Sequence, residues 1–174
     1  MAKKAFLMVG YPLVEAIKEI QDKIDDNDLY VEENAPTGFS YGKETEPHVT
    51  LAVLRGNVKL DNVKPLLCPL ENYKVKLINL SIFNDKHNDE RFDVLKCDVE
   101  CDALYSTNDA ISRKFSVNKC HDGEFNPHIT VAYLKKGKGK EYEQKLAEQL
   151  PKSVILEPVH FMYNIKGDRT IFTE

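Results

Sequence analysis

The segment Glu46-Pro-His-Val-Thr-Leu-Ala-Val-Leu54 returns later in the chain as Asn126-Pro-His-Ile-Thr-Val-Ala-Tyr-Leu134. The Pro, His, Thr, Ala and Leu positions are identical in the two copies, and the two histidines lie 80 positions apart (128 minus 48). The polar and apolar residues of each copy alternate, which is typical of a half-buried β-strand. Since residues two apart on a strand project to one face, each copy presents an imidazole beside a hydroxyl.

The duplicated pair of His48 with Thr50 and His128 with Thr130 is the candidate active site. One His-x-Thr alone is common in strands that have no function, whereas a duplicated pair with duplicated flanks is far more specific. The opposite, apolar face of the two strands is expected to comprise Val49, Leu51, Val53, Ile129, Val131 and Tyr133. If the two strands lie near each other in the middle of the fold, the two pairs face one another across a cleft.

The order of the predicted elements favours an α+β fold. Strands are expected at 5–10, 39–41, 48–54, 73–84, 92–100, 128–134, 159–165 and 170–173, and helices at 12–24, 60–67, 102–115 and 141–150. Each copy of the repeat follows at least one strand and one helix. Residues 1–174 are therefore expected to form a single domain of two pseudo-symmetric lobes, with antiparallel sheets around a central cleft and helices outside.

Composition limits the function classes that fit the chain. Its 174 residues carry 24 Lys+Arg and 28 Asp+Glu, a net charge of −4, which disfavours binding to long nucleic acids and leaves room for a small anionic ligand. No stretch of about 18 apolar residues is present, so no membrane association is expected. The four cysteines, Cys68, Cys97, Cys101 and Cys120, form no C-x-x-C pair and fit reduced thiols in the cytoplasm.

The two motifs and their flanks resemble those of the 2H phosphoesterase superfamily, which is named for two His-x-Thr/Ser motifs and includes LigT-like RNA 2′,3′-cyclic phosphodiesterases, formerly called 2′-5′ RNA ligases. The segments 41–50, 92–100 and 126–137 resemble 2H proteins encoded by tailed phages more narrowly. The resemblance implies a duplicated bilobal fold and carries catalytic roles onto His48, Thr50, His128 and Thr130. It also implies a host-cytoplasmic location if the chain is phage-encoded.

The chemistry of these residues fits phosphodiester cleavage. One imidazole removes a proton from the attacking oxygen, the other protonates the leaving oxygen, and the threonine hydroxyls donate to the nonbridging oxygens. The scheme needs no metal and no cofactor, and the two near-equivalent copies leave open which histidine is the base. The leading substrate is a cyclic or 2′-5′-linked signalling nucleotide used in antiviral defence. The alternatives are an RNA end bearing a 2′,3′-cyclic phosphate, a non-catalytic nucleotide-binding module, and a purely structural role for both strands.

Residues that would hold the substrate are predicted from their place next to the motifs. Tyr11 follows the first strand and could stack on a base, and Phe39 and Tyr41 precede the first motif. Lys135 and Lys136 open the only dense basic run and could attract phosphates. The remaining histidines, His87, His121 and His160, have no threonine two positions on and are expected to be structural or exposed.

Overall fold

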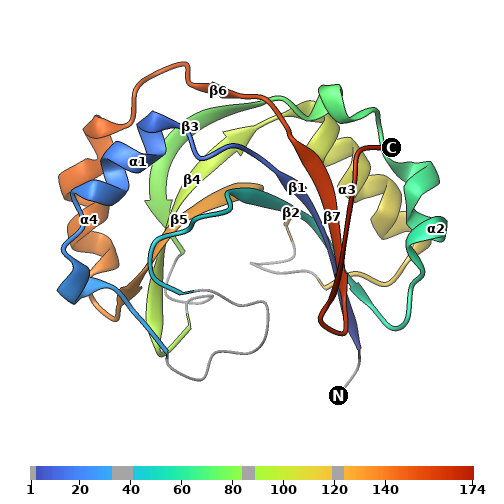
Figure 1. The fold of residues 1–174 in the computed structure, drawn as a ribbon, viewed down its shortest axis with the longest axis horizontal. Coiled ribbons are helices and arrows are strands. Elements are labelled where there is room, and N and C mark those ends of the chain that lie inside the picture. The colour runs from blue at the N-terminus through green and yellow to red at the C-terminus, as the bar shows by residue number, and fades with distance from the viewer. Residues whose placement is uncertain (1–2, 33–40, 84–88, 119–123) are drawn as a thin grey trace.

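Two four-stranded antiparallel sheets form the centre of the computed structural model, which describes residues 3–32, 41–83, 89–118 and 124–174 (Figure 1). Sheet A has the strand order β2 (His48–Arg55), β1 (Lys4–Gly10), β7 (His160–Ile165), β8 (Asp168–Phe172). Sheet B has the order β5 (His128–Lys135), β4 (Phe92–Glu100), β3 (Val75–Ile82), β6 (Ile155–Leu156). The predicted α+β class is confirmed, and β2 and β5, which carry the repeat, occupy equivalent edges.

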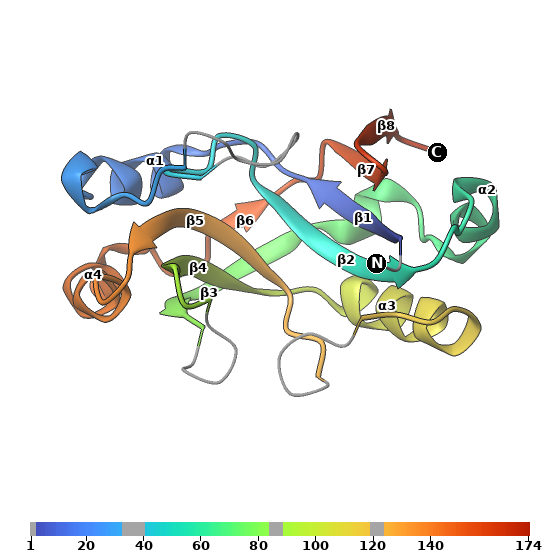
Figure 2. The same ribbon diagram turned by 90° about the horizontal axis from the view of Figure 1, so that it is seen from below.

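Two helices connect strands of one sheet but pack on the other sheet. Helix α1 (Glu15–Asp22) joins β1 to β2 of sheet A but packs on β5 of sheet B, beside α4 (Gly139–Leu146). Helix α3 (Asp102–Lys114) joins β4 to β5 of sheet B but packs on β2 of sheet A. Figures 1 and 2 show the first pair of helices at one end and α3 with α2 (Leu60–Val63) at the other. The crossed connections tie the two halves together.

One buried apolar cluster runs through both halves. It takes Val9 and Val49 from sheet A, Cys97 and Ile129 from sheet B, and apolar side chains from the helices. Helix α1 contributes because its isoleucines recur at helical spacing on one buried face. The helix-facing side of each sheet is therefore the core side, and the opposite side of β2 and β5 is left for His48, Thr50, His128 and Thr130, all of which are partly exposed.

Both repeat strands contain a β-bulge at the same position. The register with the neighbouring strand slips by one residue at Leu51 in β2 and at Val131 in β5. A bulge shifts the alternation of the faces by one residue, and the two strands consequently share one burial pattern, with four buried and three half-buried residues in the same order. The expectation that Val53 and Tyr133 lie on the apolar core face is wrong, because each follows the bulge and lies on the histidine face.

Most other element predictions match the structure, with differences at their ends. The short strand β6 was not expected, and the helix predicted for 141–150 is α4 followed by a 3₁₀ turn. The strand expected at 39–41 lies mainly outside the described residues, and Tyr41 is in no strand. Further 3₁₀ turns occur at Asp26–Asp28, Lys64–Leu66 and Leu70–Tyr73. None of the helices in the described ranges is long and apolar enough to cross a membrane.

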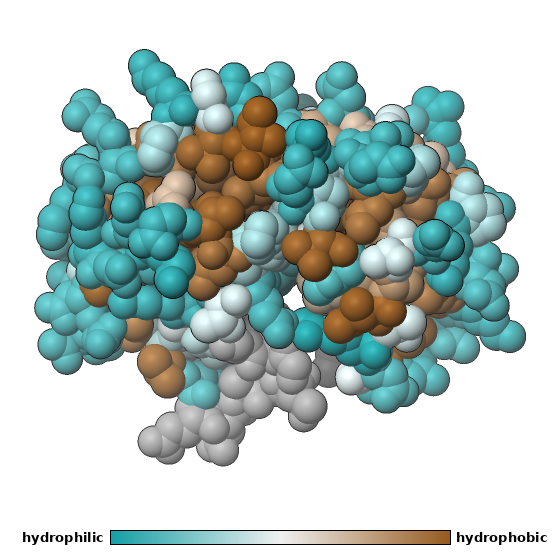
Figure 3. Space-filling model, turned by 45° about the horizontal axis from the view of Figure 1, so that its top comes forward, coloured by the Kyte–Doolittle hydropathy of each residue, from teal (hydrophilic) through white to brown (hydrophobic). Residues whose placement is uncertain are grey.

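The face of the molecule shown in Figure 3 has both hydrophilic and apolar parts. On the face shown in Figure 3, apolar side chains gather toward the middle, between hydrophilic ends. The large apolar residues with more than half of their surface exposed are Val31, Ile78, Ile155 and Ile171. Ile78 and Ile155 lie on the paired strands β3 and β6, whereas Val31 and Ile171 belong to other parts of the chain.

Candidate functional site

The two repeat strands meet at the centre of the molecule. β2 and β5 are edge strands of different sheets, yet they lie in contact, as both ribbon views show (Figures 1 and 2). The entry to each strand is held in the same way: Tyr11 N donates to Pro47 O at 2.8 Å, and Val99 N donates to Pro127 O at 3.3 Å. The structure therefore brings the two His-x-Thr strands together in equivalent settings.

The two catalytic candidates have the same imidazole orientation. His48 Nδ1 lies 2.9 Å from the carbonyl oxygen of Glu46, and His128 Nδ1 lies 2.9 Å from that of Asn126. A carbonyl can only accept, so each contact requires the proton on Nδ1. In the neutral ring, Nε2 then carries the lone pair, which is the arrangement that a general base needs.

Amide side chains from the crossed helices hold the two bulges. Gln21 of α1 donates through Nε2 to Val131 O at 3.0 Å and to Glu44 O at 2.8 Å. Asn108 of α3 donates through Nδ2 to Leu51 O at 2.8 Å. The carbonyl of a bulged residue lies outside the regular ladder of its sheet, and a buried carbonyl without a partner is costly. The amides therefore stabilise the backbone shift next to Thr50 and Thr130.

The chain leading into the first motif is bound to the strand of the second. Glu44 N donates to Val131 O at 3.0 Å, and Tyr133 N donates to Gly42 O at 2.8 Å, so residues 42–44 run along the free edge of β5. The buried Glu44 carboxylate then accepts from Glu46 N at 3.0 Å, and the carbonyl of Glu46 orients His48. A continuous set of hydrogen bonds thus links the two motifs.

A polar cluster lies beside the second motif on sheet B. In register across β5, β4 and β3, His128 is followed by Asp98 and Asn79, and Thr130 by Lys96 and Ser81. We call Lys96, Asp98, Asn79 and Ser81 the polar plate. Lys96 Nζ lies 2.6 Å from Asp98 Oδ1 and 2.7 Å from Ser81 Oγ, and Asp98 Oδ2 accepts from Asn79 Nδ2 and Ser81 Oγ, both at 2.9 Å. The Lys96 side chain is only 9% exposed, so a buried cation lies next to Thr130.

Aromatic rings continue this wall on both sides of the second motif. The Phe83 ring contacts His128 edge-on, with centroids 5.0 Å apart, and Lys96 Nζ lies 5.3 Å from the Phe83 centroid. Burial raises the pKa of Tyr133 to about 12, with Glu44 adding to the rise and a hydrogen bond with Thr130 opposing it. Tyr133 is therefore a neutral hydroxyl beside the Thr130 hydroxyl at physiological pH.

The wall beside the first motif is made of different residues. In register across β2, β1 and β7, His48 is followed by Gly10 and His160, and Thr50 by Met8 and Met162. Both methionines are buried. Arg169 of β8 reaches Glu46, the residue that orients His48, with 3.0 Å between Nη1 and Oε2.

The structure places the predicted substrate-binding residues in different surroundings. Tyr11 is 5% exposed and donates to Tyr73 O at 2.7 Å, and burial raises its pKa. Its ring has no open face on which a base could stack, so Tyr11 is assigned to the core instead of the site. Tyr41 packs edge-on against Tyr133, with centroids 5.2 Å apart, and also against Tyr30 and Phe92. Phe39 lies outside the described residues.

The basic run lies away from the motifs. Lys135 ends β5, seven residues beyond His128, or about 23 Å at roughly 3.3 Å per residue. Lys136 Nζ lies 3.3 Å from Asp93 Oδ1 and donates to Asp89 O at 2.8 Å. The structure therefore does not bring Lys135 and Lys136 to the two histidines, and Lys136 has anionic and carbonyl partners of its own.

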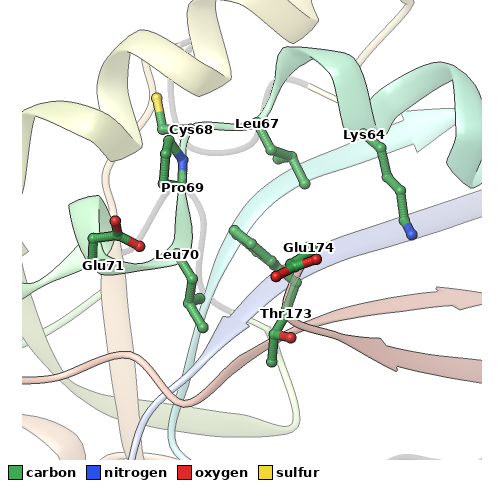
Figure 4. A pocket seen from close by; sticks show the side chains of 9 residues that line it. Lys64, Leu67, Cys68, Pro69, Leu70, Glu71, Thr173 and Glu174 are labelled. Atoms are coloured by element: carbon green, nitrogen blue, oxygen red, sulfur yellow. The ribbon is translucent and has the colours of Figure 1, made fainter.

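The pocket shown in Figure 4 lies elsewhere. It has a volume of about 530 Å³ and is lined from the segment before β3, from β7 and from the C-terminal residues by Lys64, Leu67, Cys68, Pro69, Leu70, Glu71, Phe161, Thr173 and Glu174. None of the four motif residues lines it. Within the described ranges, no three His, Cys, Asp or Glu side chains gather as a metal-binding group.

The fold defined by these elements is a duplicated α+β architecture, in which two antiparallel sheets meet at their repeat-bearing edges. Usb1 from Kluyveromyces marxianus has this fold, with a TM-score of 0.65 at 10% identity over 98% of both chains. A second structure, of the same protein with uridine monophosphate, has a TM-score of 0.57 at 8% identity, again over 98% of both chains. No family model and no curated protein matches the sequence.

Proposed function

We propose that this protein is a phosphodiesterase of the 2H type that cleaves a phosphodiester bond in a small nucleotide or short oligonucleotide. The observation that carries the proposal is the duplication of the site itself. His48 and His128 lie on contacting strands, and each is oriented through Nδ1 by the carbonyl two residues before it. A structural role for the two strands would not require the same tautomer twice.

In the proposed reaction, both proton transfers use Nε2. The neutral imidazole takes the proton of the attacking oxygen, which forms a bond to phosphorus, while the protonated imidazole gives its proton to the leaving oxygen as that bond breaks. Thr50 and Thr130 donate to the nonbridging oxygens, where negative charge grows. The Lys96–Asp98 ion pair lies beside Thr130, on one side of the proposed phosphorus position. No step uses a metal.

Two substrate classes are proposed. The resemblance to phage-encoded 2H proteins supports a cyclic or 2′-5′-linked signalling nucleotide, whose cleavage in the host cytoplasm would counter antiviral defence. The fold shared with Usb1, one structure of which holds uridine monophosphate, supports an RNA end bearing a 2′,3′-cyclic phosphate. In both cases the partner is a small nucleotide or short oligonucleotide, in keeping with the net charge of −4.

The proposal is tested by incubating the protein with EDTA and a panel of cyclic dinucleotides, cyclic trinucleotides, 2′-5′ oligoadenylate and 2′,3′-cyclic nucleotides. At least one compound should be consumed, with a bell-shaped pH dependence, because one imidazole must be neutral and the other protonated. His48→Gln and His128→Gln should each lower turnover by about 10²- to 10⁴-fold, whereas Arg113→Gln, on the exposed side of α3, should not.

Two outcomes would count against this function. Turnover that survives both histidine substitutions would remove the enzyme assignment. A tight nucleotide complex without turnover, unaffected by pH, would indicate the non-catalytic binding module instead.

A further inference from the structure

A third histidine shares the face of the first motif. Across three neighbouring strands of sheet A, His48, Gly10 and His160 are register partners. Residues directly opposite each other on adjacent strands project to the same face. His160 therefore lies on the same side of the sheet as His48, and it is partly exposed.

Gly10 leaves the space between the two histidines to the His160 ring. A Cβ atom added to Gly10 would lie 2.7 Å from His160 Nε2 and 2.9 Å from Cδ2. The imidazole thus lies over the backbone of β1, with its Nε2 edge above Gly10. A strand glycine often marks a close approach of another group to the backbone, and here that group is the ring of His160.

This arrangement turns His160 toward β2. Strands two apart in a sheet are separated by about 9.6 Å, and a ring that leans over the middle strand spans part of that distance. The register position between the two imidazoles is Gly10, which contributes no side chain. The equivalent positions in sheet B hold Asp98 in place of Gly10 and Asn79 in place of His160. The third imidazole is therefore specific to the first half.

We propose that His160 is a substrate-binding residue of the site, donating from Nε2 to a nonbridging phosphate oxygen of the substrate beside His48. This inference rests on the proposed function and adds a residue to it. Gly10 is assigned the matching role of making room for the His160 ring. Since a hydrogen bond to a charged group is worth more than a neutral one, loss of His160 should weaken substrate binding measurably.

The test is a double-mutant cycle. His160→Ala and Gly10→Ala should each lower kcat/KM by about 10- to 100-fold, mainly through KM. The double variant should be no worse than His160→Ala alone, because the added methyl then meets no ring. Asn164→Ala, further along β7, is the matched control and should keep wild-type kinetics. Thermal melts of all variants report folding.

Several results would overturn the inference. One is a His160→Ala variant whose kcat/KM is within twofold of the wild-type value. Another is a double variant whose loss of kcat/KM is the product of the two single losses. If Gly10→Ala does not fold, the comparison of His160→Ala with His160→Gln decides, since the glutamine retains a side-chain N–H donor and should recover part of the lost KM.

A titration with inorganic phosphate separates this inference from the proposed function. Phosphate should shift the imidazole NMR signals of His160, identified by their absence in His160→Ala, and the variant should bind phosphate more weakly. A wild-type protein that consumes no compound of the panel would contradict the proposed function, while the phosphate titration would still decide for or against His160. No shift on His160 would refute its role.

Discussion

The faces of sheet A and sheet B carry the same His-x-Thr pair in different surroundings. Beside the motif of sheet B lies the polar plate, with a buried lysine, a carboxylate, an amide and a hydroxyl. The matching positions of sheet A hold Met8, Gly10, Met162 and His160. Tyr133, after the second bulge, corresponds to Val53 after the first.

The two sheets share the features that orient the motif and differ in the side chains around it. The features that orient the motif are duplicated: the carbonyl that binds Nδ1, the bulge, and the helix amide that holds the bulge. The side chains that would meet the substrate are different. Two imidazoles that are oriented alike but surrounded differently are not interchangeable, so the phosphodiester should bind in one direction.

The largest effect, on the free energy of unfolding, is expected from the Lys96–Asp98 pair, which has no counterpart at the matching positions of sheet A. Asp98→Ala leaves the Lys96 ammonium in a nearly buried position without its counter-charge, which should lower the free energy of unfolding by about 3–5 kcal/mol. Urea denaturation measures the loss. Adding Lys96→Met to Asp98→Ala should recover much of it, since the uncompensated charge is then removed. A double variant less stable than Asp98→Ala would contradict this account of the plate.

The next largest effect is a difference in turnover between variants of the two threonines. Thr50→Ala should slow turnover by roughly 10²-fold or more, as the loss of an oxyanion donor does. Thr130→Ala should have a smaller effect, because the Lys96 ammonium lies in register beside Thr130. This ammonium has three protons and, among the described residues, donates to Ser81 and Asp98. Single-turnover rates of the two variants provide the comparison. Equal losses would show that the plate does not compensate for Thr130.

The next prediction concerns a feature that both sheets share, the helix amide that binds the bulge. Gln21→Ala removes two hydrogen bonds from a side chain that is 5% exposed, and Asn108→Ala removes one from a half-buried side chain. Val131 O keeps its bond from Glu44 N, so Gln21→Ala leaves Glu44 O without its amide donor, as Asn108→Ala leaves Leu51 O. At about 1–3 kcal/mol for a buried group left without a partner, Gln21→Ala should destabilise the protein more because its position is more deeply buried. Each variant should disturb the motif on the opposite sheet, which amide NMR shifts of β5 and β2 would report. Shifts confined to the variant's own helix would contradict the crossed arrangement.

The sequence was sufficient to predict the features that occur in both halves of the molecule. The paired motifs follow from the repeated segment, the α+β class from the order of the predicted elements, and the common face of histidine and threonine from period-two alternation. The structure bears out the fold class. The bulges could not be predicted, because the four consecutive apolar or aromatic residues that begin at Leu51 and at Val131 look the same in sequence with or without a register slip. Val53 and Tyr133 were therefore placed on the wrong face.

The residues that lie beside only one of the two motifs were missed for another reason. Lys96 and Asp98 become neighbours of the motif only through strand pairing, and pairing partners are distant in sequence. The signal that existed was a pair of opposite charges, Lys96 and Asp98, two apart within the predicted strand Phe92–Glu100. His160 was set aside because it has no threonine two positions on, although its importance lies in the glycine opposite it, 150 residues earlier (160 minus 10).

The smallest expected effect concerns high pH and again distinguishes the two sheets. Burial raises the pKa of Tyr133 and of Cys97 to about 12, from 10.0 and 9.0, and sheet A has Val53 and Val9 at the matching positions. The folded state keeps these protons longer than the unfolded chain does. Their contribution to stability is complete below about pH 9 and is lost as the pH rises toward 12.

The melting temperature of the wild type, followed by circular dichroism, should therefore fall between pH 9 and 11. Tyr133→Phe and Cys97→Val each remove one of the titrating groups, so their melting temperatures should fall less steeply when each is referred to its own value at pH 7. That reference cancels the constant change in packing that either substitution causes. Part of the decline should remain in both variants, because burial also raises the pKa of Tyr73 to about 12. Burial also raises the pKa of Tyr163 in sheet A, which adds to the remaining decline. Slopes identical to the wild type would mean that Tyr133 and Cys97 do not contribute to the loss of stability at high pH.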